Sequence, residues 1–358
     1  MSSSSAVRPN PAATEPESGF RAWLKSPRSI QTALIAGLIF SLAFTALIYF
    51  TAPGLEAFPK LPDQGADWYY WKLAEPTTMS RLTSWGLYLA QQFIIWGLIW
   101  YAQKHVRKYT PGLHMVNVVA LAVNATFVVL HYFQTHIWYD GIAQDVHIFT
   151  SQWSVIIMLI WIMLMESRNR GLAFGKKVGF SKGIVQFARK YHGYYFAWAI
   201  IYTYWFHPME GTPGHLLGFF YTFMLLLQGS LFFTRLHVNK WWMVLMEVTV
   251  LAHGTIVAIV QGNNLWPMFL FGFFGVFIVT QMWGLNLRRP VAWLFLALYI
   301  GGIVLIWSQR GPTRLWEPIA IPMVYYLGVF IMAAIFGAGL WIARKVRRPK
   351  AALPTAAA

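Results

Sequence analysis

Residues 31–52 read QTALIAGLIFSLAFTALIYFTA, a predominantly apolar stretch without a single charged residue. A helix needs about 20 such residues to cross the roughly 30 Å of hydrocarbon in a bilayer. The apolarity is continuous rather than alternating, which favours a membrane-spanning helix over a strand of a barrel. This stretch alone predicts an integral membrane protein.

Nine further runs of similar length and character follow it, at 83–103, 113–135, 149–165, 192–208, 215–234, 241–261, 265–285, 290–308 and 318–343. The sequence therefore predicts an all-α fold, a polytopic integral membrane bundle of about ten transmembrane helices. We expect this transmembrane domain to cover residues 30–345. The polar segments 1–29 and 346–358 flank it, and their composition predicts disordered cytoplasmic ends.

Composition agrees with this class. Charged residues make up 11% of the chain, against about 25% in a soluble domain. The net charge is +16, but the basic residues form short runs between apolar segments, which suits anionic lipid headgroups and not nucleic acid. The absence of cysteine excludes disulfides, thiolate metal sites and cysteine catalysis.

The charges also predict an orientation. With the N-terminus inside, 23 of the 28 Lys and Arg residues fall on the inner side and eight of the 12 acidic residues on the outer side. Every inner connection is basic, as the positive-inside rule requires. We therefore expect both termini in the cytoplasm, anionic lipids at the cytoplasmic face, and a location in a bacterial cytoplasmic (inner) membrane.

Two connections are unusual. The outer segment between about residues 52 and 82 is weakly acidic and has Trp68, Tyr69, Tyr70 and Trp71 at its centre, a cluster typical of an aromatic belt at the membrane interface. A lid over an outer site is the alternative interpretation. The inner stretch 166–191 carries seven bases and is predicted to be the longest cytoplasmic loop.

Ionisable residues inside spans are costly, so each needs a reason. The stretch 243–256, MVLMEVTVLAHGTI, contains Glu247 and His253. Six residues correspond to about 600° of helix, so these two side chains point about 120° apart and do not form one tight site by themselves. A proton path through them would make the chain a transporter. However, no Gly or Pro break recurs at matching positions of the two halves, which counts against an inverted repeat.

A second polar pattern lies in the run 113–135. Asn117, Asn124 and His131 are spaced by seven residues and share one helix face. Hydrogen bonding between helices explains the asparagines. His131 is also the first member of a dense polar group at the outer side.

That outer group contains most of the residues from which a metal site could be built. Imidazole and carboxylate are the ligands that iron, copper and zinc accept when thiolate is absent. The predicted metal ligands are His131, His136, His147, His207, His215 and His253, and the predicted catalytic acids are Asp140, Asp145 and Glu247. If the helix continued that far, His136 and Asp140 would share a face. The four other histidines, His105, His114, His192 and His237, lie at the inner side and are interpreted as interface residues.

These patterns support several functions. The first is a metal-dependent membrane oxidoreductase, with iron or copper, acting on a lipophilic or small substrate. The second is a cytochrome with non-covalent haem b, the third is a proton-coupled permease using Glu247 and His253, and the fourth is a structural subunit bound to other membrane subunits. Membrane desaturases and hydroxylases are excluded because the chain has no adjacent histidine pair. Phosphate-loop, dinucleotide and nucleophile-elbow motifs are absent as well.

Overall fold

The computed structural model describes residues 19–62, 71–262 and 264–347. Within these ranges the chain forms eleven α-helices and four short 3-10 helices, with isolated β-bridges and no strand. In chain order the elements are α1 (Gly19–Lys25), α2 (Pro27–Thr51), η1 (Ala52–Ala57), α3 (Thr78–His105), α4 (Met115–Trp138), η2 (Ile142–Gln144), α5 (Ile148–Glu166), α6 (Lys182–Phe206), α7 (Pro213–Ser230), α8 (Lys240–Val260), α9 (Trp266–Val279), η3 (Gln281–Leu285), α10 (Arg289–Arg310), η4 (Pro312–Arg314) and α11 (Glu317–Arg347).

The ten predicted runs lie in order on helices α2 to α11. Six of the helical segments in the described ranges are long and apolar enough to cross a membrane: Pro27–Ala57, Met115–Trp138, Ile148–Glu166, Lys240–Val260, Arg289–Arg310 and Pro312–Val346. Helix α9 is strongly apolar but only 14 residues long. The all-helical fold with these segments supports a helical membrane bundle.

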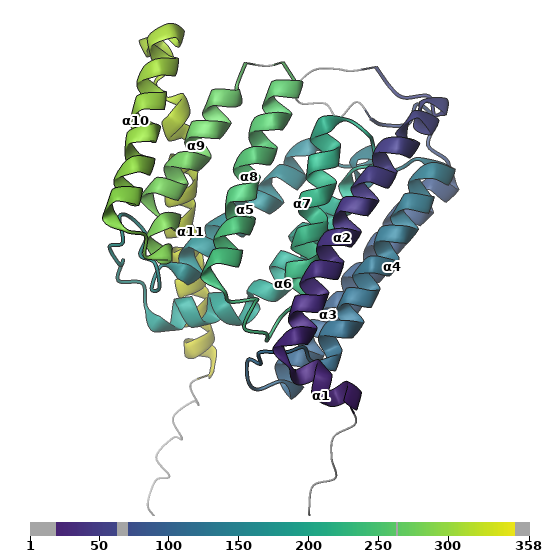
Figure 1. Cartoon of the computed structure of the whole chain (residues 1–358), viewed down its shortest axis with the longest axis horizontal. Coiled ribbons are helices and arrows are strands. Elements are labelled where there is room, and N and C mark those ends of the chain that lie inside the picture. The colour runs from purple at the N-terminus through teal and green to yellow at the C-terminus, as the bar shows by residue number, and fades with distance from the viewer. Residues whose placement is uncertain (1–18, 63–70, 263, 348–358) are drawn as a thin grey trace, which may run out of the picture.

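The long helices stand side by side in one bundle (Figure 1). Helices α2, α3, α4, α6 and α7 share one core, in which Trp205 and Phe206 are fully buried. Helices α5, α8, α9 and α11 pack around a second core at Leu164 and Val329. Helix α10 lies at one edge against α9, and Trp307 is its only buried residue.

Two boundaries differ from the prediction. The segment predicted as disordered through residue 29 includes helix α1, whose Leu24 is buried and accepts a hydrogen bond from the Leu113 amide at 2.7 Å. Helix α6 begins at Lys182, so the inner connection between α5 and α6 covers only residues 167–181. Of the predicted aromatic belt, residues 68–70 lie outside the described ranges.

We call the end of the bundle where α2 ends and α3 begins the outer end, and the opposite one the inner end, following the predicted orientation. Helix α1 and the last turn of α11 both lie at the inner end (Figure 1). The α5–α6 connection is also at this end and folds back against the bundle, turning at Gly171 and Gly175, where φ is +78° and +73°. The Phe174 amide donates to the Val279 carbonyl at 2.7 Å, and Thr280 Oγ1 donates to the Leu172 carbonyl at 2.5 Å.

These bonds occur where α9 stops. Thr280 has φ −124° and ψ −58°, and the chain continues as the 3-10 helix η3. The predicted run 265–285 is therefore a helix broken near its inner end. The sequence near residue 280 has no proline to mark the break, and the connection 167–181 accounts for it by bonding the backbone there.

The polar face of α4 serves helix packing. Asn117 and Asn124 are buried, and Asn124 accepts from Gln91 Nε2 on α3 and donates to Ser230 Oγ on α7, both at 2.9 Å. Gln91 Oε1 in turn accepts from the Trp205 indole on α6 at 2.7 Å. The predicted interhelical role of the asparagines is confirmed, because one amide network joins four helices.

Replacing Asn124 with alanine removes the acceptor for the Gln91 amide inside the bundle. We expect the free energy of unfolding to fall by about 1–3 kcal/mol, measured by denaturation in mixed detergent micelles. Val129→Ala, on the lipid-facing side of the same helix, is the control and should change stability by less than about 0.5 kcal/mol. Equal losses in the two variants would contradict the proposed network.

Candidate functional site

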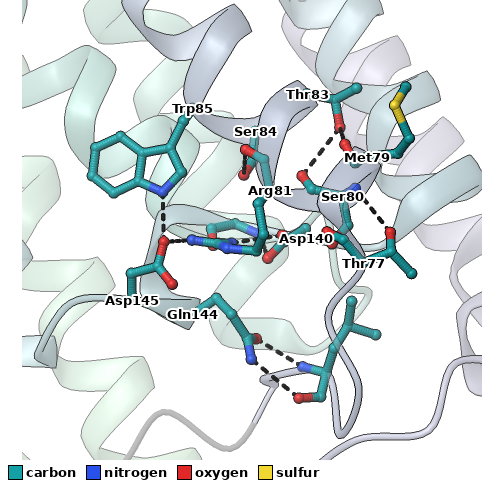
Figure 2. A network of polar contacts seen from close by, with 12 residues as sticks. Thr77, Met79, Ser80, Arg81, Thr83, Ser84, Trp85, Asp140, Gln144 and Asp145 are labelled. Carbon is teal, nitrogen blue, oxygen red and sulfur yellow. Dashed lines mark hydrogen bonds and ion pairs between the residues drawn. The ribbon is translucent and has the colours of Figure 1, made fainter.

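At the outer end, the connection between α4 and α5 is fixed to the start of α3 by charge. Arg81 on α3 contacts two carboxylates, with Nη1 2.6 Å from Asp140 Oδ2 and Nη2 paired with Asp145 (Figure 2). The Trp85 indole also donates to Asp145, at 2.7 Å. Gln144 completes the attachment by bonding both the amide and the carbonyl of Leu73. Both predicted catalytic aspartates are thus bound to α3.

Asp140 is almost fully buried, whereas Asp145 is exposed. Burial raises the pKa of the Asp140 carboxyl, and the Arg81 charge opposes this shift. The Gly141 amide donates to Asp140 Oδ1 at 2.7 Å. A Cβ at Gly141 would lie 2.5 Å from the Phe206 carbonyl oxygen, so glycine is what allows this connection to approach the end of α6.

His131 lies beneath this connection and is fully buried against the Trp205 ring, with ring centroids 4.2 Å apart. Its Nε2 is 2.9 Å from the His207 carbonyl oxygen, and its Nδ1 is 3.0 Å from Gln134 Oε1. A neutral imidazole satisfies both contacts when it donates from Nε2 and the Gln134 amide turns its NH2 group toward Nδ1. His131 therefore holds the backbone of His207 in place.

Three of the six predicted histidines gather just beyond, where α6 ends, α7 begins and α8 passes. The ring centroids of His207 and His215 are 5.4 Å apart. The Trp71 and His215 rings pack edge to face, with their centroids 4.4 Å apart. His253 lies within electrostatic range of both. The sequence placed these residues on one side of the membrane, and folding brings them together from three segments.

His253 packs from α8 against the start of α7. A Cβ at Gly218 would lie 3.0 Å from His253 Nε2, so the glycine lets the ring lie close against α7. His207 is thus held by a second histidine, whereas the His215 ring is held by Thr212, whose Oγ1 is 2.8 Å from His215 Nδ1.

A buried acid adjoins the histidines. Glu210, in the connection between α6 and α7, is paired with Lys60 Nζ at 2.5 Å and accepts a short hydrogen bond from the Tyr139 hydroxyl. Lys60 lies over the Tyr139 ring, 4.9 Å from its centroid, and within electrostatic range of His215. Lys60, Tyr139 and Glu210 were not predicted as site residues. The sequence feature that could have identified Lys60 is that it is one of the few basic residues on the predicted outer side.

The two remaining predicted histidines lie elsewhere. Helix α4 ends at Trp138, and Tyr139 adopts a left-handed conformation with φ 43°, so His136 and Asp140 do not share a helix face. His136 packs on Tyr132 and contacts its carbonyl at 2.9 Å. His147 is the exposed N-cap of α5 and accepts from the Phe149 amide at 3.3 Å. Neither ring joins the central group.

Across the described ranges, no three His, Asp or Glu side chains are arranged so that they could hold a metal ion as they stand. Among the described residues, the outer group thus brings together a pair of neighbouring histidine rings rather than a set of three ligands. We define the outer histidine site as His207 and His215, with His131 as its positioning residue and His253 packed beside it on α8.

Glu247 belongs to a different part of the molecule. Arg170, from the α5–α6 connection, forms a bidentate pair with it, with both N–O distances 2.9 Å. Gln281 Nε2 donates to Glu247 Oε2 at 2.9 Å, and all three side chains are buried. A cavity of about 10 Å³, lined by Glu247, Gln281 and Tyr325 among others, adjoins the pair and has room for about one water. Nothing in the residue pattern indicated that Arg170, one of the seven bases of this inner stretch, enters the bundle.

Comparison with known proteins finds no match among protein families, curated proteins or solved structures. No residue role can be carried over from a relative. What the outer histidine site can do follows from its own contacts.

The Arg170–Glu247 pair gives a sharp stability prediction. Arg170→Leu leaves a buried carboxylate without its cation and should lower the free energy of unfolding by about 3–5 kcal/mol. The double variant Arg170→Leu/Glu247→Leu removes both charges and should regain at least about 1 kcal/mol of that loss. Denaturation in mixed micelles measures both. A double variant no more stable than Arg170→Leu would rule out the pair as the cause.

Proposed function

We propose that the chain is a ten-span protein of a bacterial cytoplasmic membrane with both termini in the cytoplasm. The basic inner connections support this topology, as do the ten apolar runs that lie on α2 to α11. The same connections would attract anionic lipids at the inner face. Other membrane subunits are further candidate partners, and the largely lipid-exposed α10 offers a face for them.

We further propose that the outer histidine site binds iron or copper and makes the chain a metal-dependent membrane oxidoreductase acting on a lipophilic or small substrate. The observation that carries this proposal is the pair of rings of His207 and His215, whose centroids are 5.4 Å apart and whose positions are fixed by neighbouring groups. His131 Nε2 bonds to the His207 carbonyl, and Thr212 Oγ1 is 2.8 Å from His215 Nδ1. Histidines that bind metals commonly have the other ring nitrogen bonded, as His215 has.

The spacing of the rings suits a shared ion. Metal–nitrogen bonds of about 2.0–2.1 Å place the centroids of two imidazoles on one tetrahedral ion about 5 Å apart. The centroids of His207 and His215 are 5.4 Å apart. Two protein ligands leave open positions for water and substrate, as catalytic metal sites require. Imidazole ligands without thiolate favour iron, copper or zinc, and the first two support redox chemistry.

The neighbouring charged group can handle protons. Tyr139 donates to Glu210, which Lys60 also contacts, so a carboxylate that accepts hydrogen bonds lies beside the site. Bound iron or copper would supply one-electron redox chemistry, and the Glu210 carboxylate would accept a proton released beside it. Asp140 and Asp145 act instead as positioning residues, because both are bound to Arg81.

The alternatives receive less support from the geometry. Haem b would take its axial pair from His131, His207, His215 and His253, and using His131 would break its bond to the His207 carbonyl. A permease using Glu247 would have to break a bidentate pair with Arg170. A structural subunit has no need of metal. It is therefore separated from the oxidoreductase by metal content.

Metal content tests the proposal directly. We expect the parent protein, purified in mild detergent, to contain one equivalent of iron or copper per chain. The double variant His207→Ala/His215→Ala should contain none at this site, because both ligands are removed. Elemental analysis measures the loss. His147→Ala is the matched control, since this exposed histidine lies at the same end of the bundle and should leave metal content unchanged.

Retention volume in size exclusion shows whether the double variant is folded, and His207→Gln/His215→Gln repeats the test with polar side chains of similar reach. Metal content equal to the parent in both folded variants would overturn the proposal. A Soret band in the parent that disappears when His207 or His215 is substituted would show that the site binds haem b instead of a single metal ion.

A further inference from the structure

A second pair of histidines meets at the inner end, in a region unrelated to the outer histidine site. His192 lies on α6, and His237 lies in the connection between α7 and α8. Their ring centroids are 6.3 Å apart and their planes are inclined by 31°. Both rings are half-buried.

Hydrogen bonds select the same tautomer in both rings. His192 Nδ1 is 2.7 Å from the Arg189 carbonyl oxygen, and His237 Nδ1 is 3.0 Å from the Gln228 carbonyl oxygen. A carbonyl oxygen can only accept, so Nδ1 carries the proton in each ring. An imidazole is mainly neutral at pH 7, and Nε2 then has its lone pair available to a metal ion.

The position of His237 is fixed from two sides. The Gln228 side chain donates from Nε2 to the His237 carbonyl at 3.1 Å, while the Gln228 backbone accepts from the His237 ring. The Trp242 indole donates to Gln228 Oε1 and so orients the amide. Histidines that bind metals typically have the other ring nitrogen bonded to a carbonyl and the surrounding groups fixed in this way.

The separation of the rings suits an ion held from opposite sides. With metal–nitrogen bonds of about 2.0–2.1 Å, two imidazoles in a linear arrangement have centroids about 6 Å apart. Two-coordinate binding is characteristic of the cuprous ion. Arg189 and Lys190 lie beside His192 in the chain, and Arg235 lies two residues before His237. A monovalent ion experiences less repulsion from these bases than a divalent ion does.

We infer that His192 and His237 form a cuprous ion site at the inner end of the bundle. The inference is independent of the outer histidine site, since it uses neither its residues nor its metal. It assigns a ligand role to two histidines that the sequence pattern had placed among interface residues.

The test uses the full chain in mild detergent, with the outer ligands already removed by His207→Ala/His215→Ala. Cuprous ion is supplied under reducing conditions in competition with a chromophoric chelator. We expect this parent to retain one copper per chain, and His192→Ala or His237→Ala to weaken binding at least tenfold. His105→Ala is the matched control, because His105 makes the same Nδ1 contact to a carbonyl, that of Tyr101, but contacts no second histidine.

Copper binding in His192→Ala or His237→Ala as tight as in the parent would overturn the inference, as would a parent that retains no copper. If either alanine variant elutes as aggregate, His192→Gln and His237→Gln replace them with the same expectation. If the outer histidine site proved to bind no metal, these results would be unchanged, because His192 and His237 are intact in every variant of the outer site.

Discussion

Hydrocarbon offers no hydrogen bonds, so a polar group buried in a membrane bundle has to find its partner on another helix or on a connection that reaches inward. This constraint explains the central contacts of the molecule. Asn124 joins α4 to α3 and α7, Gln91 extends the network to α6, and Arg170 enters the bundle to neutralise Glu247. The arrangement of the helices depends on these few polar contacts as well as on apolar packing.

The same constraint divides the histidines by task. A ring whose two nitrogens both contact other groups, as in His131, fixes backbone and has no lone pair left for a ligand. His207 lies beside this ring, and His207 and His215 lie at the ends of two helices. His192 and His237 have one nitrogen fixed by a carbonyl and the other available. Local hydrogen bonding therefore separates supporting imidazoles from those that could bind a metal.

Much of the architecture could be predicted from sequence. The run at 31–52 and its nine successors lie on α2 to α11, because apolar length is a local property of the chain. The break of α9 near Thr280 was not predicted, because it depends on contacts with the connection 167–181. The seven-residue spacing of Asn117, Asn124 and His131 correctly indicated one buried face. Spacing could not distinguish His136, which packs on Tyr132 of its own helix, from His207, which meets a residue on another helix. That difference depends on where α4 ends, and Tyr139 sets that end through a left-handed turn.

The contact between residues 172–174 and the broken end of α9 has a consequence for biogenesis. Backbone groups near Thr280 are satisfied by a connection made more than 100 residues earlier in the chain. The inner end of α9 cannot reach its final form until that connection has folded back and Arg170 has reached Glu247. The C-terminal helices are thus not a separable unit, because the inner end of α9 needs contacts that the first half of the chain supplies. If the two halves were synthesised as separate polypeptides, a complete bundle would form only where both were inserted in the same membrane.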